Sequence, residues 1–286
     1  MELNGKIIYT TKGAAREYGR IGCNFYTGCP HNCEYCYLKR GAPSKQLGGN
    51  EVQLKKCFKN KDEAAQRFVY ELNKWSKECK EHGLFLSFTT DPMIDETIEL
   101  TQVAIHNCAL NDIPVRILTK DANFIRNDNF MAFIDRFAPG VRKKIHFGFT
   151  LTGHDDMEPK ASKNSERILA MRKMAIMGYP TFASIEPVID WPSSERIIHE
   201  SVLWCDHYKL GLRSGVKKDY YDTSKSGAAI LRIVQYCESY NRTLYLKESA
   251  RKLLKQYLQP GAYEALLSHT VDMDGNPITC DAQSLE

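Results

Sequence analysis

Three cysteines are crowded into eight residues of the stretch NFYTGCPHNCEYCYLKR, which covers residues 24–40. Cys29, Cys33 and Cys36 have the spacing C-x3-C-x2-C. Thiolates are strong ligands of soft metal centres, and three of them on one short loop can surround a single centre. The spacing therefore indicates a metal site that has three protein thiolates and one position open for chemistry.

Zinc and iron–sulfur centres differ in what they need as a fourth ligand. A structural zinc site is closed by four protein ligands, and a ferredoxin-like site has a fourth cysteine nearby. His31 could be a fourth ligand, but it is crowded between two cysteines, and Cys23 and Cys57 lie outside the run. The spacing favours a cubane cluster with three thiolates and one open iron. A zinc site and an accidental trio of buried cysteines remain as alternatives.

The elements that must position this loop follow from the hydrophobic pattern. Short apolar, β-forming runs recur at intervals of roughly thirty residues, as expected for βα units. They cover residues 20–25, 84–88, 114–119, 146–151, 181–186, 207–211 and 243–247. Helical periodicity lies between them, at 62–79 and at about 97–110, 128–137, 164–177, 226–240 and 249–258.

Six or seven such units predict an α/β fold, a partial (β/α)6-type parallel TIM-like barrel with the cluster loop after the first strand. In such a barrel the loops that follow the strands build the site. A flat doubly wound sheet is the alternative, but no G-x-G-x-x-G follows the first strand. We expect a single domain over 1–286, with a core at about 12–250 and a C-terminal helical extension and tail at 251–286.

Composition narrows the class of protein. No apolar run is long enough for a signal peptide or a membrane span, which predicts a cytoplasmic protein without a membrane partner. The ten cysteines are then expected to be reduced, metal-bound or catalytic. The net charge is only +4, but residues 1–60 contain ten Lys/Arg and four Asp/Glu. This excess of positive charge is typical of a solvated surface. The alternative is that an anionic ligand binds near the cysteine loop.

The stretch GCPHNCEYCY resembles the signature of radical S-adenosylmethionine enzymes. Further stretches resemble the spore photoproduct lyase-like branch of that superfamily, in order over about residues 12–250. They are KGAAREY, SFTTDPM, ILTKDANFIRND, FTLTGHDD, ERILAMRKMAIMGYPTFASIEPVI and LYLKES. The resemblance implies a [4Fe-4S] cluster whose open iron binds S-adenosylmethionine, and reductive cleavage of this cofactor to a 5′-deoxyadenosyl radical.

The resemblance also implies roles for individual residues. Cys29, Cys33 and Cys36 would bind the cluster. The implied cofactor contacts are Tyr35 at the adenine, Thr90 and Asp91 at the methionine amino group, Lys120 at the carboxylate, Thr150 at the ribose or methionine, and Glu186 at the same mouth. An ammonium group favours an anion and a carboxylate favours a cation. The alternatives are a turn role for Asp91 before Pro92, a solvated strand end for Lys120 and a buried structural acid for Glu186.

One departure separates this sequence from spore photoproduct lyases. They have a cysteine immediately before the Thr-Ser-Asp element, and this cysteine donates a hydrogen atom to the repaired thymine. Phe88 occupies the matching position here, and a phenyl ring does not readily donate hydrogen. Tyr37 matches a lyase tyrosine and is the candidate catalytic relay, with packing of the loop as its alternative. This departure predicts that the protein does not repair spore photoproduct efficiently.

Three functional hypotheses remain at this level. The first is a radical enzyme of the lyase-like, DNA repair photolyase-like branch that acts on a nucleic acid or nucleotide. The second is the same chemistry on a peptide or small metabolite, and the third is a non-enzymatic zinc or iron–sulfur binding module. An electron donor such as flavodoxin or ferredoxin is an implied partner. Fold and cofactor do not fix the substrate.

Overall fold

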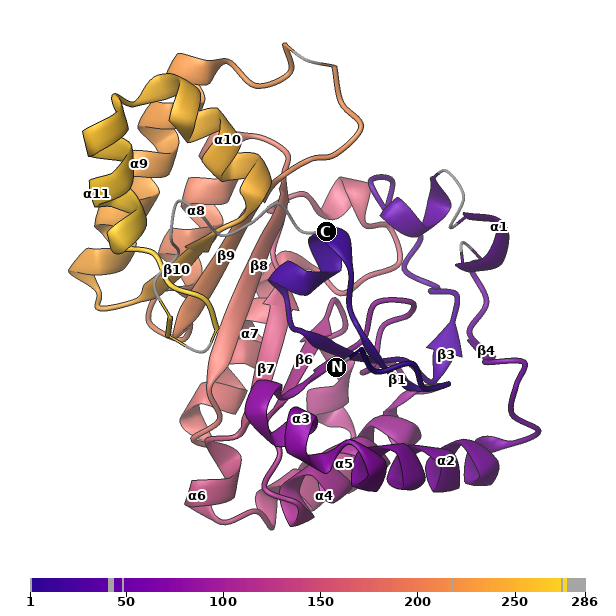
Figure 1. The fold of residues 1–286 in the computed structure, drawn as a ribbon. Coiled ribbons are helices and arrows are strands. Elements are labelled where there is room, and N and C mark those ends of the chain that lie inside the picture. Colours follow the sequence, from indigo (N-terminus) through magenta and orange to yellow (C-terminus); the bar gives the residue numbers. More distant parts are fainter. Residues whose placement is uncertain (1, 41–43, 48, 218, 274, 277–286) are drawn as a thin grey trace.

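The structure is a computed structural model that describes residues 2–40, 44–47, 49–217, 219–273 and 275–276. Its centre is an eight-stranded sheet with the order β1-β2-β5-β6-β7-β8-β9-β10 (Figure 1). The strands are β1 (Ile8–Thr10), β2 (Ile21–Cys23), β5 (Leu84–Leu86), β6 (Val115–Thr119), β7 (Ile145–Thr150), β8 (Thr181–Val188), β9 (His207–Leu212) and β10 (Thr243–Leu246).

The seven strands from β2 to β10 are parallel, and each coincides with one of the seven predicted runs. The expected α/β barrel-like fold is thus confirmed. β1 was not predicted; it pairs antiparallel with β2 at the edge of the sheet. The small hairpin of β3 (Tyr26–Thr27) and β4 (Gln53–Leu54) was also missed, and it flanks the cysteine loop.

The sheet is a partial barrel, because its order starts at β1 and ends at β10 without a pairing between them in the described part of the chain. Glu17, in the short helix η1 (Gly13–Glu17), links the two ends. Its Oε1 accepts hydrogen bonds from the backbone N of Glu248 at 2.7 Å and from Tyr245 Oη at 3.3 Å. Its carbonyl oxygen accepts one from Lys209 Nζ at 2.5 Å.

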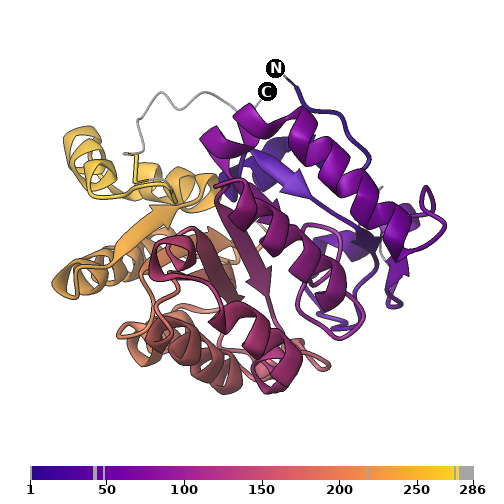
Figure 2. The ribbon, with the colours of Figure 1, turned by 90° about the horizontal axis from the view of Figure 1, so that it is seen from below.

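Helices surround the outside of the curved sheet (Figure 2). They are α1 (Ser44–Leu47), α2 (Lys61–Lys74), α3 (Ser76–His82), α4 (Ile98–Leu110), α5 (Asp128–Asp135), α6 (Pro139–Arg142), α7 (Asn164–Ile176), α8 (Trp191–Ser201), α9 (Thr223–Ser239), α10 (Glu248–Tyr257) and α11 (Pro260–Ser268). Short 3-10 turns are η2 (Tyr37–Lys39), η3 (Asn123–Arg126) and η4 (Asp155–Met157). In the described part of the chain, no helix is long and apolar enough to cross a bilayer.

Side-chain caps fix where several helices begin. Asn60, Asn127, Asp190 and Asp222 each accept a hydrogen bond from the backbone N–H three residues later, which satisfies a donor that the first helical turn leaves free. The helix predicted over 62–79 is divided at Trp75, whose φ of −116° and ψ of 30° interrupt the helix. Helix α8 was not predicted from the sequence.

Buried aromatic side chains hold the middle of the sheet to the helices. Phe124 stacks on Phe147 with ring centroids 5.9 Å apart, and Tyr179 meets Phe147 edge to face at 5.2 Å. Phe182 from β8 lies against Gly148, where a Cβ would come within 2.0 Å of its ring. A residue larger than glycine at this position would push two adjacent strands apart.

Candidate functional site

A cavity of about 340 Å³ opens where the parallel strands end. All ten of the predicted site residues line it, and they are Cys29, Cys33, Tyr35, Cys36, Tyr37, Thr90, Asp91, Lys120, Thr150 and Glu186. They come from the loops after β2, β5 and β6 and from the ends of β7 and β8. The structure therefore brings together residues that are up to 157 positions apart in the sequence.

The cysteine loop follows β2, the first of the parallel strands, and is anchored to the β3–β4 hairpin. The backbone N of Cys29 donates to Gly49 O at 2.9 Å, and that of Cys36 donates to Cys33 O at 3.3 Å. Gly28 has a φ of +79°, and a Cβ there would lie 2.0 Å from Glu51 O. Only glycine accepts both conditions, so this residue determines how closely the loop approaches the hairpin.

The three thiols are the residues that the sequence predicts to bind a metal centre. In the part of the chain that is described, no group of three or more Cys, His, Asp or Glu side chains is arranged to hold one metal ion. A structural zinc ion needs four ligands at about 2.0–2.3 Å. A cluster binds its thiolates on different irons, so its ligands stand further apart around a wider space. Cys29, Cys33 and Cys36 all line the cavity, and a cluster bound by these thiols stays a prediction.

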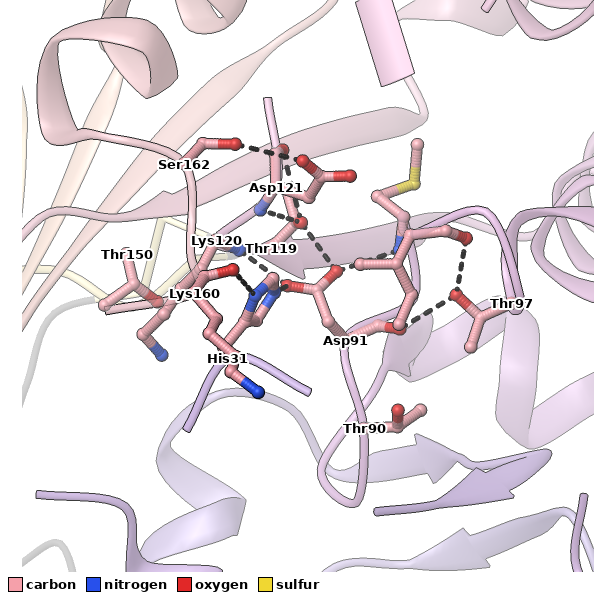
Figure 3. Close-up of polar contacts among 12 residues, drawn as sticks. His31, Thr90, Asp91, Thr97, Thr119, Lys120, Asp121, Thr150, Lys160 and Ser162 are labelled. Carbon is pink, nitrogen blue, oxygen red and sulfur yellow. Dashed lines mark hydrogen bonds and ion pairs between the residues drawn. The ribbon is translucent and has the colours of Figure 1, made fainter. Parts of the chain in front are cut away.

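Asp91 is the centre of a buried hydrogen-bond network at the ends of β5 and β6 (Figure 3). Its Oδ2 accepts from His31 Nε2 at 2.8 Å and from the backbone N of Lys120 at 2.7 Å. Its Oδ1 accepts from Thr119 Oγ1 at 2.7 Å and from the backbone N of Met93 at 2.9 Å. Burial alone would raise the pKa of Asp91, but the charge and hydrogen bonds of these donors lower it to about 2.

Four protein donors therefore occupy the Asp91 carboxylate, which fixes the cysteine loop to the strand ends through His31. The His31 Nδ1 lies 3.2 Å from Lys160 O, so both ring nitrogens have partners. In this arrangement Asp91 holds the site together. Its predicted contact with a methionine amino group stays a prediction.

Thr90 and Lys120 present polar groups to the cavity. Thr90 Oγ1 is buried and, within the described residues, has no hydrogen-bond partner, and the side chain stands apart from the dashed network in Figure 3. A buried hydroxyl without a partner is costly, which makes it a natural contact for a ligand. Lys120 Nζ lies 5.6 Å from the centre of the Tyr35 ring. Burial would lower its pKa, but Cys33 and Glu158 raise it, so the lysine stays charged.

Tyr35 is held by a buried ion pair that the sequence did not reveal. Its Oη donates to Glu158, and Glu158 Oε2 lies 2.6 Å from Arg167 Nη2. Both charged side chains are 0% exposed, and Arg167 Nη1 also donates to Thr150 O at 2.7 Å. The pair thus positions two predicted site residues at once. Nothing in the spacing of the sequence marks Glu158, because its partners are brought to it by the fold.

A second polar cluster lines the cavity, at the ends of β8 and β10. Lys247 Nζ lies 2.8 and 2.7 Å from the two carboxylate oxygens of Glu186. Tyr18 Oη donates to the same carboxylate and lies 2.6 Å from Ser184 Oγ. A Cβ at Gly211 would come within 2.8 Å of Lys247 and 3.0 Å of Glu186, so glycine leaves space for the pair.

Neither Tyr18 nor Lys247 was predicted as a site residue, although both lie in stretches that carry the resemblance, KGAAREY and LYLKES. Each follows an element that ends at the cavity, η1 for Tyr18 and β10 for Lys247. Their position at the ends of these elements could have identified both as candidate site residues.

Phe88 and Tyr37 lie together at the rim. The Phe88 ring stacks on Phe85, with centroids 4.6 Å apart, and its edge faces Tyr18 at 6.4 Å. Tyr37 is 53% exposed, and its hydroxyl donates to the backbone oxygen of Phe88. The phenyl ring thus occupies a packed position on the wall of the cavity.

Comparison with known proteins identifies the fold. No protein-family model matches the sequence, and no curated protein matches it. A spore photoproduct lyase variant with bound AdoMet and dinucleoside spore photoproduct is similar in structure, with a TM-score of 0.61 and 15% identity over 83% of this chain and 79% of that one. SuiB of Streptococcus suis, bound to S-adenosylmethionine, aligns with a TM-score of 0.51 and 12% identity over 77% of this chain and 44% of that one. Both are radical SAM enzymes, so the chain has a radical SAM, spore photoproduct lyase-like fold.

Proposed function

We propose that this protein binds a [4Fe-4S] cluster through Cys29, Cys33 and Cys36 and reductively cleaves S-adenosylmethionine, acting on a nucleic acid or nucleotide. The observation that supports this most directly is the meeting of the three thiols with Thr90, Lys120 and Thr150 around one cavity. When bound, the cluster and cofactor supply a 5′-deoxyadenosyl radical. The protein supplies orientation and excludes water.

The residues around the cavity suit the two ends of an amino acid and a purine ring. Lys120 offers a cation for the carboxylate, and Thr90 Oγ1 offers an acceptor for the amino group. The Tyr35 ring, fixed by Glu158, gives the adenine a surface to pack on. Thr150, whose backbone is held by Arg167, completes the wall on the ribose side. Asp91 acts through His31 and the Lys120 backbone as a positioning residue.

The substrate class is inferred from the similar structures. Spore photoproduct lyase holds a dinucleoside, whereas SuiB holds its precursor peptide SuiA. The spore photoproduct lyase structures match with the higher TM-scores and over most of their own length, which favours a nucleic acid or nucleotide. A peptide or small metabolite is the second candidate, because Phe88 replaces the cysteine that completes the lyase reaction. An electron carrier of the flavodoxin or ferredoxin class would reduce the cluster. We propose the cytoplasm as the compartment, where ten cysteines stay reduced.

Anaerobic reconstitution with iron and sulfide tests the cofactor assignment. The expected result is a brown protein with four irons and four sulfides per chain, which forms 5′-deoxyadenosine from S-adenosylmethionine under reducing conditions. A colourless protein that binds one zinc ion and forms no 5′-deoxyadenosine would instead identify a non-enzymatic zinc module. A brown protein that never cleaves the cofactor would identify an iron–sulfur module.

The nucleic-acid assignment has a separate test. Binding of oligonucleotides should weaken steeply with salt, because cationic side chains that contact phosphates release counterions. Absence of binding at low salt would favour the peptide or small-metabolite alternative.

A further inference from the structure

The cavity has a half that the proposed cofactor contacts do not use. The cysteines, Thr90, Lys120 and Thr150 come from the loops after β2, β5 and β6 and from the end of β7. The other wall comes from the ends of β8, β9 and β10 and from η1. Because the sheet order runs from β2 to β10 without interruption, these two groups of strand ends lie on different arcs of the barrel. The second arc is therefore where a substrate would meet the cofactor.

Cationic side chains outnumber acidic ones in the lining of the cavity. Its acidic lining residues are Asp91 and Glu186, and its cationic lining residues are Lys39, Lys120, Arg213 and Lys247. Asp91 is already occupied by four protein donors. The cavity as a whole thus favours an anionic occupant.

Three of the four cations already have a partner or an assigned role. Lys39 Nζ donates to Asn32 Oδ1, and Lys247 is paired with Glu186 at 2.7 Å and with Glu17 at 3.4 Å. Lys120 lies over Tyr35, where the proposed cofactor carboxylate would meet it. This leaves Arg213.

Arg213 lies directly after β9 and lines the cavity, and its Nε is buried without a hydrogen-bond partner in the described part of the chain. Leaving a buried charged donor unpaired costs more than leaving a neutral one. Glu186, the acid on the same wall, is taken by Lys247 and Tyr18. Among the described residues nothing accepts a hydrogen bond from Nε of Arg213, so an anion in the cavity would supply the missing acceptor.

The backbone around Arg213 is held in place, so this unpaired group is not a consequence of a loose loop. The Arg213 backbone N donates to Tyr221 Oη at 2.8 Å, and Tyr221 Oη donates to Val188 O at 2.5 Å. Arg40, which follows the cysteine loop, donates from Nη1 to Ser214 O at 3.1 Å and from Nη2 to Glu34 O at 3.4 Å. The loop after β9 is thus tied both to β8 and to the cysteine loop.

We propose that Arg213 binds an oxyanion of the substrate, a phosphate or carboxylate group. A guanidinium presents two parallel N–H donors that match either group. Leu212 and the stacked rings of Phe85 and Phe88 also line the cavity and offer an apolar surface for the body of the substrate. This deepens the proposed function, on which it rests for the identity of the occupant as a substrate. The binding itself requires neither cluster nor cofactor.

The test is therefore made on the iron-free protein. Inorganic phosphate and acetate are titrated by calorimetry against sodium chloride at equal ionic strength. Wild type should bind at least one of the two anions saturably, and the better anion identifies the oxyanion class. Arg213→Gln should weaken this binding about ten- to hundredfold, as expected for loss of a charge-assisted contact. Arg232→Gln is the matched control, because that arginine is 59% exposed and pairs with Glu195 on the outside; it should bind as wild type does.

Two results would overturn the proposal. One is the absence of saturable binding to either anion in wild type. The other is loss of binding in Lys120→Ala with unchanged binding in Arg213→Gln, which would move the anion to the cofactor half and leave the proposed function intact. If Arg213→Gln does not fold, Arg213→Lys is measured in its place. This variant keeps the positive charge but loses the two parallel N–H donors of the guanidinium, so anion affinity should fall severalfold. An affinity equal to that of wild type would refute the role of Arg213.

Discussion

The imidazole Nε2 of His31, inside the cysteine run, lies 2.8 Å from Oδ2 of Asp91, which follows β5 sixty residues later. Both side chains are almost completely buried, at 5% and 4% exposure. This contact joins the loop that would bind the cluster to the strand ends that would bind the cofactor. Together with the hydrogen bond from Tyr37 Oη to the backbone oxygen of Phe88, this contact holds the two halves of the proposed chemistry in place.

Asp91→Asn should destabilise the protein by about 3–5 kcal/mol, the usual cost of breaking a buried ion pair. The amide would place donors where His31 Nε2 or Thr119 Oγ1 now donate. Urea unfolding of the iron-free protein measures the change. Asp95→Asn is the control, because Asp95 is exposed, and its effect should stay within about 0.5 kcal/mol. Equal stability of the two variants would show that the network around Asp91 does not contribute to folding.

Changing any of Cys29, Cys33 or Cys36 to Ala should abolish cluster retention and cofactor cleavage. Cys79→Ala should not, because Cys79 of α3 is buried in the hydrophobic core. The same is expected of Cys280→Ala, a position that lies outside the described residues. Iron and sulfide counts on reconstituted protein decide the matter. A Cys33→Ala protein with four irons and full cleavage is incompatible with the assignment.

Lys120→Ala should raise the dissociation constant for S-adenosylmethionine about ten- to hundredfold, since a hydrogen bond to a charged group contributes about 1.5–3 kcal/mol. Iron content should not change. Calorimetry on reconstituted protein measures the affinity, and Lys61→Ala is the control, because Lys61 pairs with Glu99 on the surface. Unchanged affinity in Lys120→Ala would exclude the lysine from the carboxylate contact.

The unmodified protein should not convert dinucleotide spore photoproduct efficiently to thymidylyl-thymidine, because Phe88 offers no transferable hydrogen atom. Phe88→Cys should not create the activity by itself, since the ring now packs on Phe85 and its removal would leave a void. The assay is anaerobic turnover under reducing conditions, read by chromatography. Clean multiple-turnover repair by the wild-type protein would contradict this and require a different hydrogen donor.

Stability should fall in acid in part because of Glu71, which is fully buried. It accepts hydrogen bonds from the backbone N atoms of Lys6, Ile7 and Ile8 at 2.8–3.0 Å. Burial would raise its pKa, but these bonds and that from Arg67 lower it below the usual value of about 4.3. Its contribution is thus complete above the unfolded-state pKa and is lost as pH falls through the folded-state pKa.

Glu71→Gln should therefore lower stability by about 1.5–3 kcal/mol at neutral pH and reduce the loss of stability on acidification. Denaturant unfolding at several pH values measures both effects. Glu81→Gln, an exposed acid in the neighbouring helix, should leave the pH profile as it is. A Glu71→Gln profile parallel to that of wild type would rule out the contribution.

The sequence predicted those elements of the fold that have a local hydrophobic pattern of their own. All seven parallel strands are short runs rich in apolar residues, as expected for strands that are buried on both faces, and each was located. Three of them, β6, β7 and β9, also contain basic residues, namely Arg116, His146, His207 and Lys209. β1 has only three residues and owes its place to pairing with β2, so it leaves no pattern of its own. The break at Trp75 was missed because the apolar periodicity continues through it.

In the site, strand-end position and the resemblance identified residues that all meet at one cavity. Strand-end position and the resemblance did not predict which residues far away in the sequence would bind to these side chains. The acid that holds Tyr35 lies 123 residues away, and the lysine that pairs with Glu186 lies 61 residues away. The sequence also could not show that the Asp91 carboxylate accepts hydrogen bonds from four protein donors.

Glu17 gives the molecule an order of assembly during synthesis. Its partners on the far edge of the sheet lie 192, 228 and 231 residues later in the chain. At about 5–20 residues per second, a ribosome needs roughly 10–50 s to deliver the last of them. For that interval the N-terminal edge has no opposite edge to meet. The join between the two ends of the sheet must therefore be the last part of the barrel to form, and a nascent chain halted before Thr243 would expose the edge of β9.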